Sequence, residues 1–515
     1  YKLTSRETNQ RITSRFFEAL DAISDPLTGN PVCRSESARA AGCQPLNILG
    51  MNAASDAALA YFRTDRTLRV TNTQTLAGAQ LTGKLFDLPA GALASAIGVE
   101  YRRDTRSYKD DPLAELGLLS DKAAGTSLTG EDSVSEAFLE VVVPLLRDKP
   151  LVHDLSVEGA VRVSDYDSIG STTAWKYGGS WSPVKSLRLR ATASRSVRAP
   201  NLYELFAPRQ ISQINIYDPC ELSQINTAPN RATNCHALGV PVGWEGPAGV
   251  GELAIFNTVG GGNRQLDPET SDAWTVGFVF TPEALPALSI AIDYWNIEIE
   301  DAVQPLDVTA IVEKCVDSAT IDNVFCPRVT RGADSTIDLV DYSIINVGKL
   351  STDGVDVQVA YVFDPAFHGL DIPGRFTVAL NASYLRSLEE LIDSSDPASL
   401  LLRRGEYNTP AWRGTLSLGY QHRGMSVDLD TRVIGKARID MNSTLETYDR
   451  PRVPERIYND LALGYAIGTG YNLRLAVNNL FDVEPPQNPY TYLGANGALY
   501  DSIGRYFVLG GTARF

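Results

Sequence analysis

The chain lacks any long hydrophobic run. Nowhere in its 515 residues do about 18 apolar residues follow one another, so no membrane-spanning helix is expected. The mean hydropathy of −0.12 would by itself indicate a water-soluble protein. A transmembrane β-barrel gives a similar value, because only alternate residues face lipid and the others face a polar interior. The missing run therefore excludes a helical membrane protein and leaves the all-β classes open.

Motifs for catalysis and for metal or phosphate binding are absent as well. The sequence has no GxSxG and no HExxH, and "GGGNR" at 260–264 lacks the Lys-Ser/Thr of a phosphate loop. The four histidines are scattered, and "DPETSD" at 267–272 is better explained as a turn at Pro268 than as a cation site. We therefore expect no enzyme, no cofactor and no metal. The net charge of −16 argues against a nucleic-acid partner.

Alternation of apolar and polar residues is the dominant pattern that is present. In residues 187–194 the odd positions are Leu or Ala and the even positions are Arg, Thr or Ser, and the segments 155–164 and 355–363 alternate in the same way. A period of two predicts β-strands with one apolar face and one polar face. We count about 16 such strands, each of about 10 to 16 residues, which predicts an all-β fold.

Short turns and long connections follow one another along the chain. The short turns are 88–92, 184–186, 281–286 and 466–470, and the long connections are about 14–64, 201–263, 304–345 and 441–453. This asymmetry is expected of a transmembrane antiparallel β-barrel that has short periplasmic turns and long extracellular loops. A soluble β-sandwich is the alternative, but it does not explain the asymmetry. We predict that residues 1–515 form one such barrel domain.

The six cysteines form three local pairs. Each pair lies within one long connection: Cys33 with Cys43, Cys220 with Cys235, and Cys315 with Cys326. None has the spacing or the neighbouring histidine that suits zinc. We predict three local disulfides formed in an oxidising compartment, with free buried thiols as the alternative.

Four motifs and the C-terminal strand resemble one family in the right order. They are "SRSVRAPNLYELFAP" at 194–208, "LDPETSDAWTVGFVF" at 266–280, "STDGVDVQVAY" at 351–361, "LRLAVNNLFDVEPP" at 473–486 and "GRYFVLGGTARF" at 504–515. Together they resemble the second half of TonB-dependent outer-membrane receptors. The terminal Phe515 looks like the assembly signal of outer-membrane barrels.

The resemblance implies a barrel with more strands than we count in this chain. Receptors of this family have about 22 strands and a plug in the lumen. We therefore interpret the chain as the C-terminal portion of the barrel, and expect the N-terminal plug and the first strands to lie outside it. The alternative is a closed barrel of about 16 strands.

In the family, the Arg-Ala-Pro segment ends an outward strand at the extracellular rim. By this resemblance Arg195, Arg198, Pro200 and Asn201 are structural motif residues, and Pro200 stops the strand ladder where the loop begins. The two arginines could instead meet lipopolysaccharide phosphates.

The implied function is TonB-dependent active transport of a scarce nutrient across the outer membrane of a Gram-negative bacterium. Energy would come from TonB, with ExbB and ExbD, through the plug. The nutrient could be a carbohydrate or plant-derived compound, a peptide, or an iron chelate. A passive porin or an adhesin-like barrel is the alternative. From their position in the long loop at 201–263, we expect five residues to contact the cargo: Tyr203, Phe206, Arg209, Tyr217 and Trp244.

Overall fold

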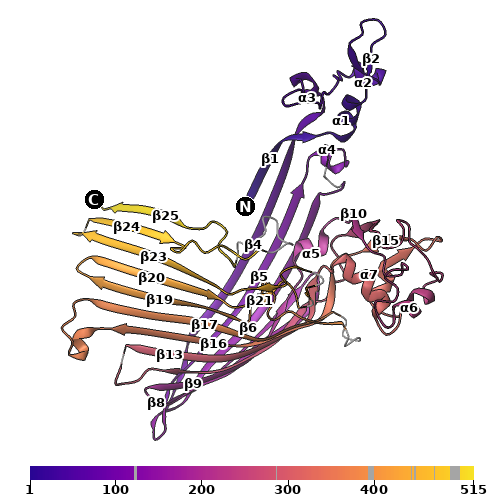
Figure 1. Cartoon of the computed structure of the whole chain (residues 1–515). Coiled ribbons are helices and arrows are strands. Elements are labelled where there is room, and N and C mark those ends of the chain that lie inside the picture. The colour runs from indigo at the N-terminus through magenta and orange to yellow at the C-terminus, as the bar shows by residue number, and fades with distance from the viewer. Residues whose placement is uncertain are drawn as a thin grey trace.

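One large antiparallel sheet dominates the computed structural model (Figure 1). The structure describes residues 1–120, 124–285, 287–392, 399–441, 443–445, 448–468, 470–487 and 499–514. The strands of the large sheet are β1 (Lys2–Arg11), β4 (Arg63–Leu88), β5 (Gly91–Lys109), β6 (Leu128–Lys149), β7 (Val152–Tyr166), β8 (Gly170–Val184), β9 (Leu187–Arg198), β12 (Glu269–Phe280), β13 (Leu288–Gln304), β16 (Ile345–Phe363), β17 (Arg375–Leu391), β18 (Leu400–Leu402), β19 (Trp412–His422), β20 (Met425–Ile434), β23 (Arg456–Ile467), β24 (Tyr471–Asn478) and β25 (Tyr506–Ala513).

Neighbouring strands pair in the order in which they follow along the chain. β1 pairs with β4, the hairpin series continues to β9, β9 pairs with β12, and the series then runs to β25. The short β18 pairs with the end of β17. Among their described residues, β1 and β25 are not paired with each other, and Figure 1 shows these two strands apart. The sheet is thus strongly curved and open, in agreement with the expectation that its strands do not close a barrel by themselves.

The predicted alternation is confirmed along the strands. On β7, Val157, Val161 and Val163 are exposed on one face, which we call the outward face. Arg162 points to the other face, where it forms an ion pair with Glu136 of β6. An exposed apolar face on one side and paired charges on the other are the pattern expected of a barrel wall between lipid and a polar lumen.

The strands are longer than the sequence pattern suggested. β4 has 26 residues and β6 has 22, whereas about 10 residues are enough to cross a bilayer. The excess length of β4 lies at the end that carries the long loops, where its buried Arg66 forms ion pairs with Glu7 and Asp110. Such pairs tie the strands together beyond the width of a membrane.

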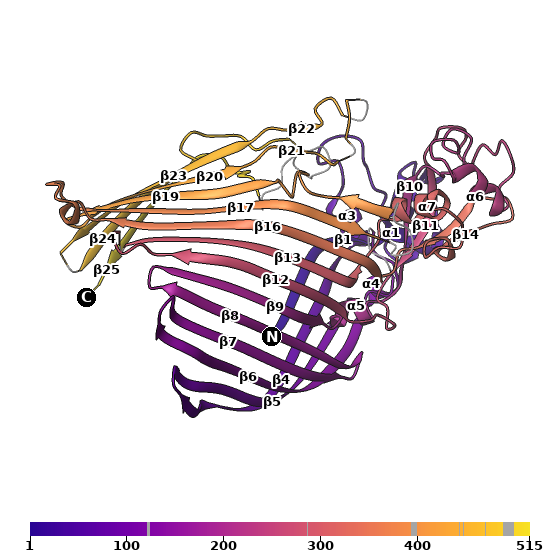
Figure 2. The ribbon, with the colours of Figure 1, turned by 90° about the horizontal axis from the view of Figure 1, so that it is seen from below.

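The helices collect at one end of the sheet (Figure 2). They are α1 (Thr13–Leu20), α2 (Glu36–Ala40), α3 (Asp56–Phe62), α4 (Pro112–Glu115), α5 (Leu202–Phe206), α6 (Arg231–Ala237) and α7 (Val308–Asp317), with the 3-10 helix η1 (Cys326–Arg328). The 3-10 helix η2 (Pro365–His368) lies at the opposite end, between β16 and β17. Among the described residues, none of the helices has the length and apolar composition needed to cross a membrane.

Three smaller sheets, of two, two and four strands, lie within the connections. They are β2 (Ala22–Ser24) with β3 (Pro31–Cys33), β21 (Ala437–Arg438) with β22 (Arg452–Val453), and a sheet of β10 (Gln210–Ile216), β11 (Ala254–Gly260), β15 (Ile337–Asp341) and β14 (Val329–Arg331). The last of these joins two different connections and is the centre of the candidate site.

Candidate ligand-binding platform

Two long connections merge into one folded unit. We call this unit the platform: residues 199–268, between β9 and β12, with residues 305–344, between β13 and β16. β10 and β11 come from the first connection and β14 and β15 from the second. β11 and β15 pair in parallel, with Asn257 opposite Leu339. Figure 1 shows this sheet beside α6 and α7 at the loop end of the barrel strands.

The platform has its own hydrophobic core, and two disulfides lie in it. Cys220–Cys235 and Cys315–Cys326 are bonded, and Cys33–Cys43 is bonded in the connection between β1 and β4. All three predicted pairings are confirmed. Buried apolar residues from both connections pack around the platform disulfides: Ile216, Ile225, Val240, Phe256, Ile311, Val312, Val316, Phe325, Ile337 and Val340. A core shared by two loops holds them in one arrangement.

Helix α7 supplies much of that core, and α6 docks against its C-terminal end. The buried residues of α7 follow the spacing of an amphipathic helix: Val308, Ile311, Val312, Cys315 and Val316. The Arg231 guanidinium of α6 donates two hydrogen bonds of 2.7 Å to the Asp317 carboxylate. The Asn234 amide donates to the carbonyls of Val316 and Ser318 at 2.9 and 2.8 Å. The two bonds from Asn234 satisfy carbonyls that the end of α7 would otherwise leave unpaired.

A buried ion pair forms a second link between the two connections. Both guanidinium ends of Arg331 donate to the Asp218 carboxylate, each at 2.7 Å. The side chains are only 9% and 2% exposed. Arg331 also lies over the Trp244 ring, 5.9 Å from its centroid. Because the charges are buried and matched in a bidentate geometry, loss of either partner would leave an uncompensated buried charge.

The segment that opens the platform shows why strand β9 ends where it does. Pro200 is buried just after the last strand residue, and Asn201 caps α5 by accepting hydrogen bonds from the Tyr203 and Glu204 amides. Glu204 in turn accepts a bond of 2.7 Å from the Asn201 amide, which completes a capping box. Arg198 forms ion pairs with Glu204 and with Glu269 of β12. The motif therefore builds a fixed turn from strand into helix.

Arg195 has a structural environment too. It forms an ion pair of 2.5 Å with Asp272, which lies opposite it on β12. With both arginines paired to carboxylates, the structure favours their role in holding the loop base over direct phosphate binding. Phe515 lies outside the described residues, as do Pro286 and Thr469 of the predicted turns.

Three of the five predicted ligand residues pack or pair within the platform. Phe206 packs against a small cluster with Leu205 and Leu266, and the Arg264 guanidinium lies 4.8 Å from the centroid of its ring. Trp244 packs against the platform core. Arg209 forms an ion pair of 2.7 Å with Asp341.

The other two predicted residues remain open to solvent. Tyr203 is 56% exposed on α5, and Tyr217 is exposed directly after β10. The five residues are thus spread over the base, the core and the surface of the platform. Sequence position did not distinguish aromatic residues that pack within the platform from accessible ones, and the role of this loop in ligand binding stays a prediction.

At the base of the platform, the Asp341 carboxyl is held in its charged form. Burial opposes ionisation of this carboxyl, but hydrogen bonds from Ser343 and the charges of Arg209 and Arg328 outweigh it and lower the pKa of Asp341. A lowered pKa means that the carboxylate persists at neutral pH, and that its stabilising contribution is lost only as the pH falls through that lowered value. Asp341 therefore keeps its charge opposite Arg209 at neutral pH.

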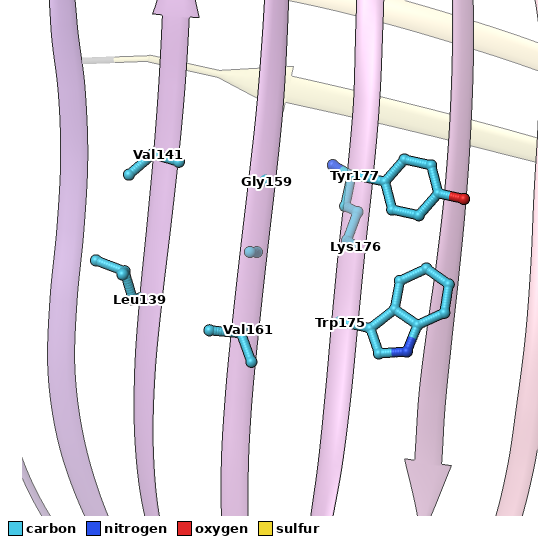
Figure 3. Close-up of a pocket in the computed structure, with 8 residues that line it drawn as sticks. Leu139, Val141, Gly159, Val161, Trp175, Lys176 and Tyr177 are labelled. Atoms are coloured by element: carbon cyan, nitrogen blue, oxygen red, sulfur yellow. The ribbon is translucent and has the colours of Figure 1, made fainter.

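Two hollows lie on the walls of the large sheet, away from the platform. A polar hollow of about 720 Å³ is lined by Arg147, His153, Lys185 and Arg188 near short turns. An apolar hollow of about 410 Å³ lies on the outward face, where Gly159 leaves room between Val141 and Tyr177. Figure 3 shows Trp175 and Tyr177 side by side along β8, and their rings are stacked 5.3 Å apart. This apolar lining suits a hydrocarbon environment rather than a water-soluble cargo.

The described geometry defines a class of protein. A curved antiparallel sheet with an apolar outward face, short turns at one end and a braced loop unit at the other is the architecture of an outer-membrane β-barrel. The family comparison makes the assignment specific. The model "TonB dependent receptor-like, beta-barrel" matches residues 34–480, so the chain belongs to the TonB-dependent receptor β-barrel family. This assignment places it among receptors rather than enzymes.

Solved structures agree on the fold. The chain is similar to the ferric enterobactin receptor PfeA of Pseudomonas aeruginosa, with 16% identity and a TM-score of 0.57, covering 90% of this chain and 55% of that one. It is also similar to the siderophore receptor PirA of Acinetobacter baumannii, with 13% identity and a TM-score of 0.54, covering 100% of this chain and 59% of that one. The chain thus spans less than two thirds of either receptor. A search of curated protein sequences finds no significant match.

Proposed function

We propose that the chain is the barrel portion of an active transporter in the outer membrane of a Gram-negative bacterium. TonB, with ExbB and ExbD, would supply the energy, and a plug in the lumen would receive it. Lipid and lipopolysaccharide would surround the outward face. Membership of the receptor family supports this proposal over a passive porin or an adhesin-like barrel.

The observation that carries the proposal is the platform at the loop end of the sheet. Two disulfides, a shared core and the Arg331–Asp218 pair hold its two connections in one arrangement. A rigid surface loses little conformational entropy when it binds a ligand, which favours capture of a scarce nutrient at low concentration. Carbohydrates, peptides and iron chelates are the candidate cargoes, and two of the similar structures are receptors for siderophores.

The energy coupling is tested by uptake in cells that express the complete gene. Candidate nutrients are supplied together at low concentration, and their depletion from the medium is followed by mass spectrometry with TonB present or deleted. We expect the initial rate of depletion of one nutrient class to be at least about tenfold higher in cells with TonB than in cells without it, because active transport by a plugged barrel needs energy input. A small sugar that enters through general porins is the control. Uptake that is unchanged without TonB would indicate a passive pore and reject the proposal.

A further inference from the structure

Strand β10 has a free and unprotected edge. It pairs with β11 over seven consecutive residues without a bulge, from Gln210 opposite Gly260 to Ile216 opposite Ala254. Among the described residues, no strand or loop is hydrogen-bonded along its other edge. Alternate residues of an edge strand direct N–H and C=O groups outward, and these groups are a template for another strand.

The sequence of β10 contains none of the usual protections. "QISQINI" has no charged residue, no proline and no glycine. By contrast, β14 at the other edge of the same sheet has three residues, a register shift and Arg331. Natural proteins shield exposed strand edges with charge, proline, bulges or shortness. An edge of seven residues with no bulge and no charged residue is therefore open to pairing with another strand.

The exposed face beside this edge accepts side chains without charge. Ile211 and Ile255 are 68% and 65% exposed, and Gln213 bonds to Asn257 at 3.2 Å between them. A strand added next to β10 would lay every second side chain beside Ile211, Gln213 and Asn215. Uncharged side chains, apolar beside Ile211 and polar or apolar beside the two amides, suit these positions.

The platform around the edge is strongly acidic. Its residues 199–268 and 305–344 contain thirteen Asp and Glu but only six Arg and Lys. Arg209, Arg231 and Arg331 are paired with carboxylates. Exposed carboxylates remain at Glu245, Glu252, Asp322, Asp334 and Asp338.

Two of these acidic residues belong to segments next to the strand pair. Glu252 is two residues before β11, whose first residue pairs with the end of β10, and the backbone carbonyl of Asp338 on β15 accepts a bond of 3.4 Å from the Asn257 side chain. Such a field attracts cations and repels anionic cargo.

From these two independent features we propose that the edge of β10 binds an extended cationic peptide by strand addition. Only a polypeptide has N–H and C=O groups at the spacing that pairs with the edge, and carbohydrates or iron chelates do not. The excess of carboxylates over basic residues on the platform favours a positively charged peptide. The inference rests on the proposed function only in taking the platform as the capturing surface, and it names the class of molecule captured.

Binding to the purified receptor tests the proposal with three synthetic probes. The first is a peptide of about eight residues that alternates lysine with valine, the second replaces lysine by glutamate, and the third is the first with alternate backbone amides N-methylated. We expect the second and third peptides to bind at least about tenfold more weakly than the first, because one lacks the charge and the other the main-chain donors. Equal binding of the N-methylated peptide would overturn strand addition, equal binding of the glutamate peptide would overturn the charge preference, and no binding of the first would overturn both.

Protein variants locate the site without relying on β10 itself. The double variant Glu252→Gln, Asp338→Asn should weaken binding of the lysine peptide severalfold and reduce its salt dependence, because the screened attraction is smaller. Asp87→Asn, at the short turn between β4 and β5, is the matched control and should leave binding unchanged. An equal loss in the control would place the site elsewhere. Because the assay contains no TonB, peptide binding with TonB-independent uptake would reject the proposed transport and keep this inference, whereas TonB-dependent uptake without peptide binding would do the reverse.

Discussion

Replacing Arg331 with methionine (Arg331→Met) is expected to open the platform while the barrel strands stay folded. The substitution removes one partner of a buried, bidentate ion pair and leaves the buried Asp218 carboxylate without its cation. Breaking such a pair costs about 3 to 5 kcal/mol. Hydrogen exchange of the β11 and β15 amides on the purified receptor measures this directly, since exchange reports the free energy of local opening.

Two further variants decide whether the effect comes from burial. Arg209→Met removes a more exposed pair with Asp341. Because exposed pairs contribute about 0 to 1 kcal/mol, the exchange of the β11 and β15 amides should change little in this variant. Arg331→Met combined with Asp218→Leu removes both buried charges and should recover much of the lost protection. Slow exchange in Arg331→Met itself would show that the ion pair does not hold the two connections together.

Deletion of residues 210–260 is expected to abolish high-affinity uptake and to leave the barrel inserted. The deleted residues include β10, β11, α6 and one disulfide of the platform, whereas the registers from β9 to β12 and onward involve none of them. Loops carry function on a scaffold that folds without them. Uptake kinetics measure the loss, and the shift of the unheated protein on gel electrophoresis checks that the barrel is folded.

The matched control for this deletion is removal of residues 22–46 from the connection between β1 and β4. That segment has its own disulfide and packs in a small core, shared with Ala19, Tyr61 and Phe62, that is separate from the platform core, so its loss should spare uptake if capture belongs to the platform. A folded 210–260 deletion that transports with unchanged affinity would place the capture site on another loop.

The sequence reveals the parts of this fold whose signals are local. A period of two is visible within a single strand, so the wall built from segments such as 155–164 was predictable. Each cysteine pair lies within one connection, at separations of 10, 15 and 11 residues, and only nearby partners had to be considered. The Arg-Ala-Pro-Asn turn was similarly readable, because proline and an N-cap residue act on their immediate neighbours.

The platform itself could not be predicted, because its contacts join distant residues. Asp218 and Arg331 are 113 positions apart, and the parallel pairing of β11 with β15 joins two connections separated by two barrel strands. No periodicity marks such contacts. For the same reason Trp244 and Phe206 resembled ligand residues in the sequence, whereas the structure packs both against other platform residues.

Surface labelling of intact cells tests most directly whether the platform lies outside the cell on an outer-membrane barrel. One epitope tag is inserted between Ala248 and Gly249 of the platform, and another between Glu283 and Ala284 of the short turn that joins β12 to β13. If long loops face outward and short turns face the periplasm, antibodies should label the first tag on intact cells and the second only after the outer membrane is permeabilised. The reverse pattern, or labelling of the platform tag only after permeabilisation, would contradict this placement of the platform and the transport function proposed for it.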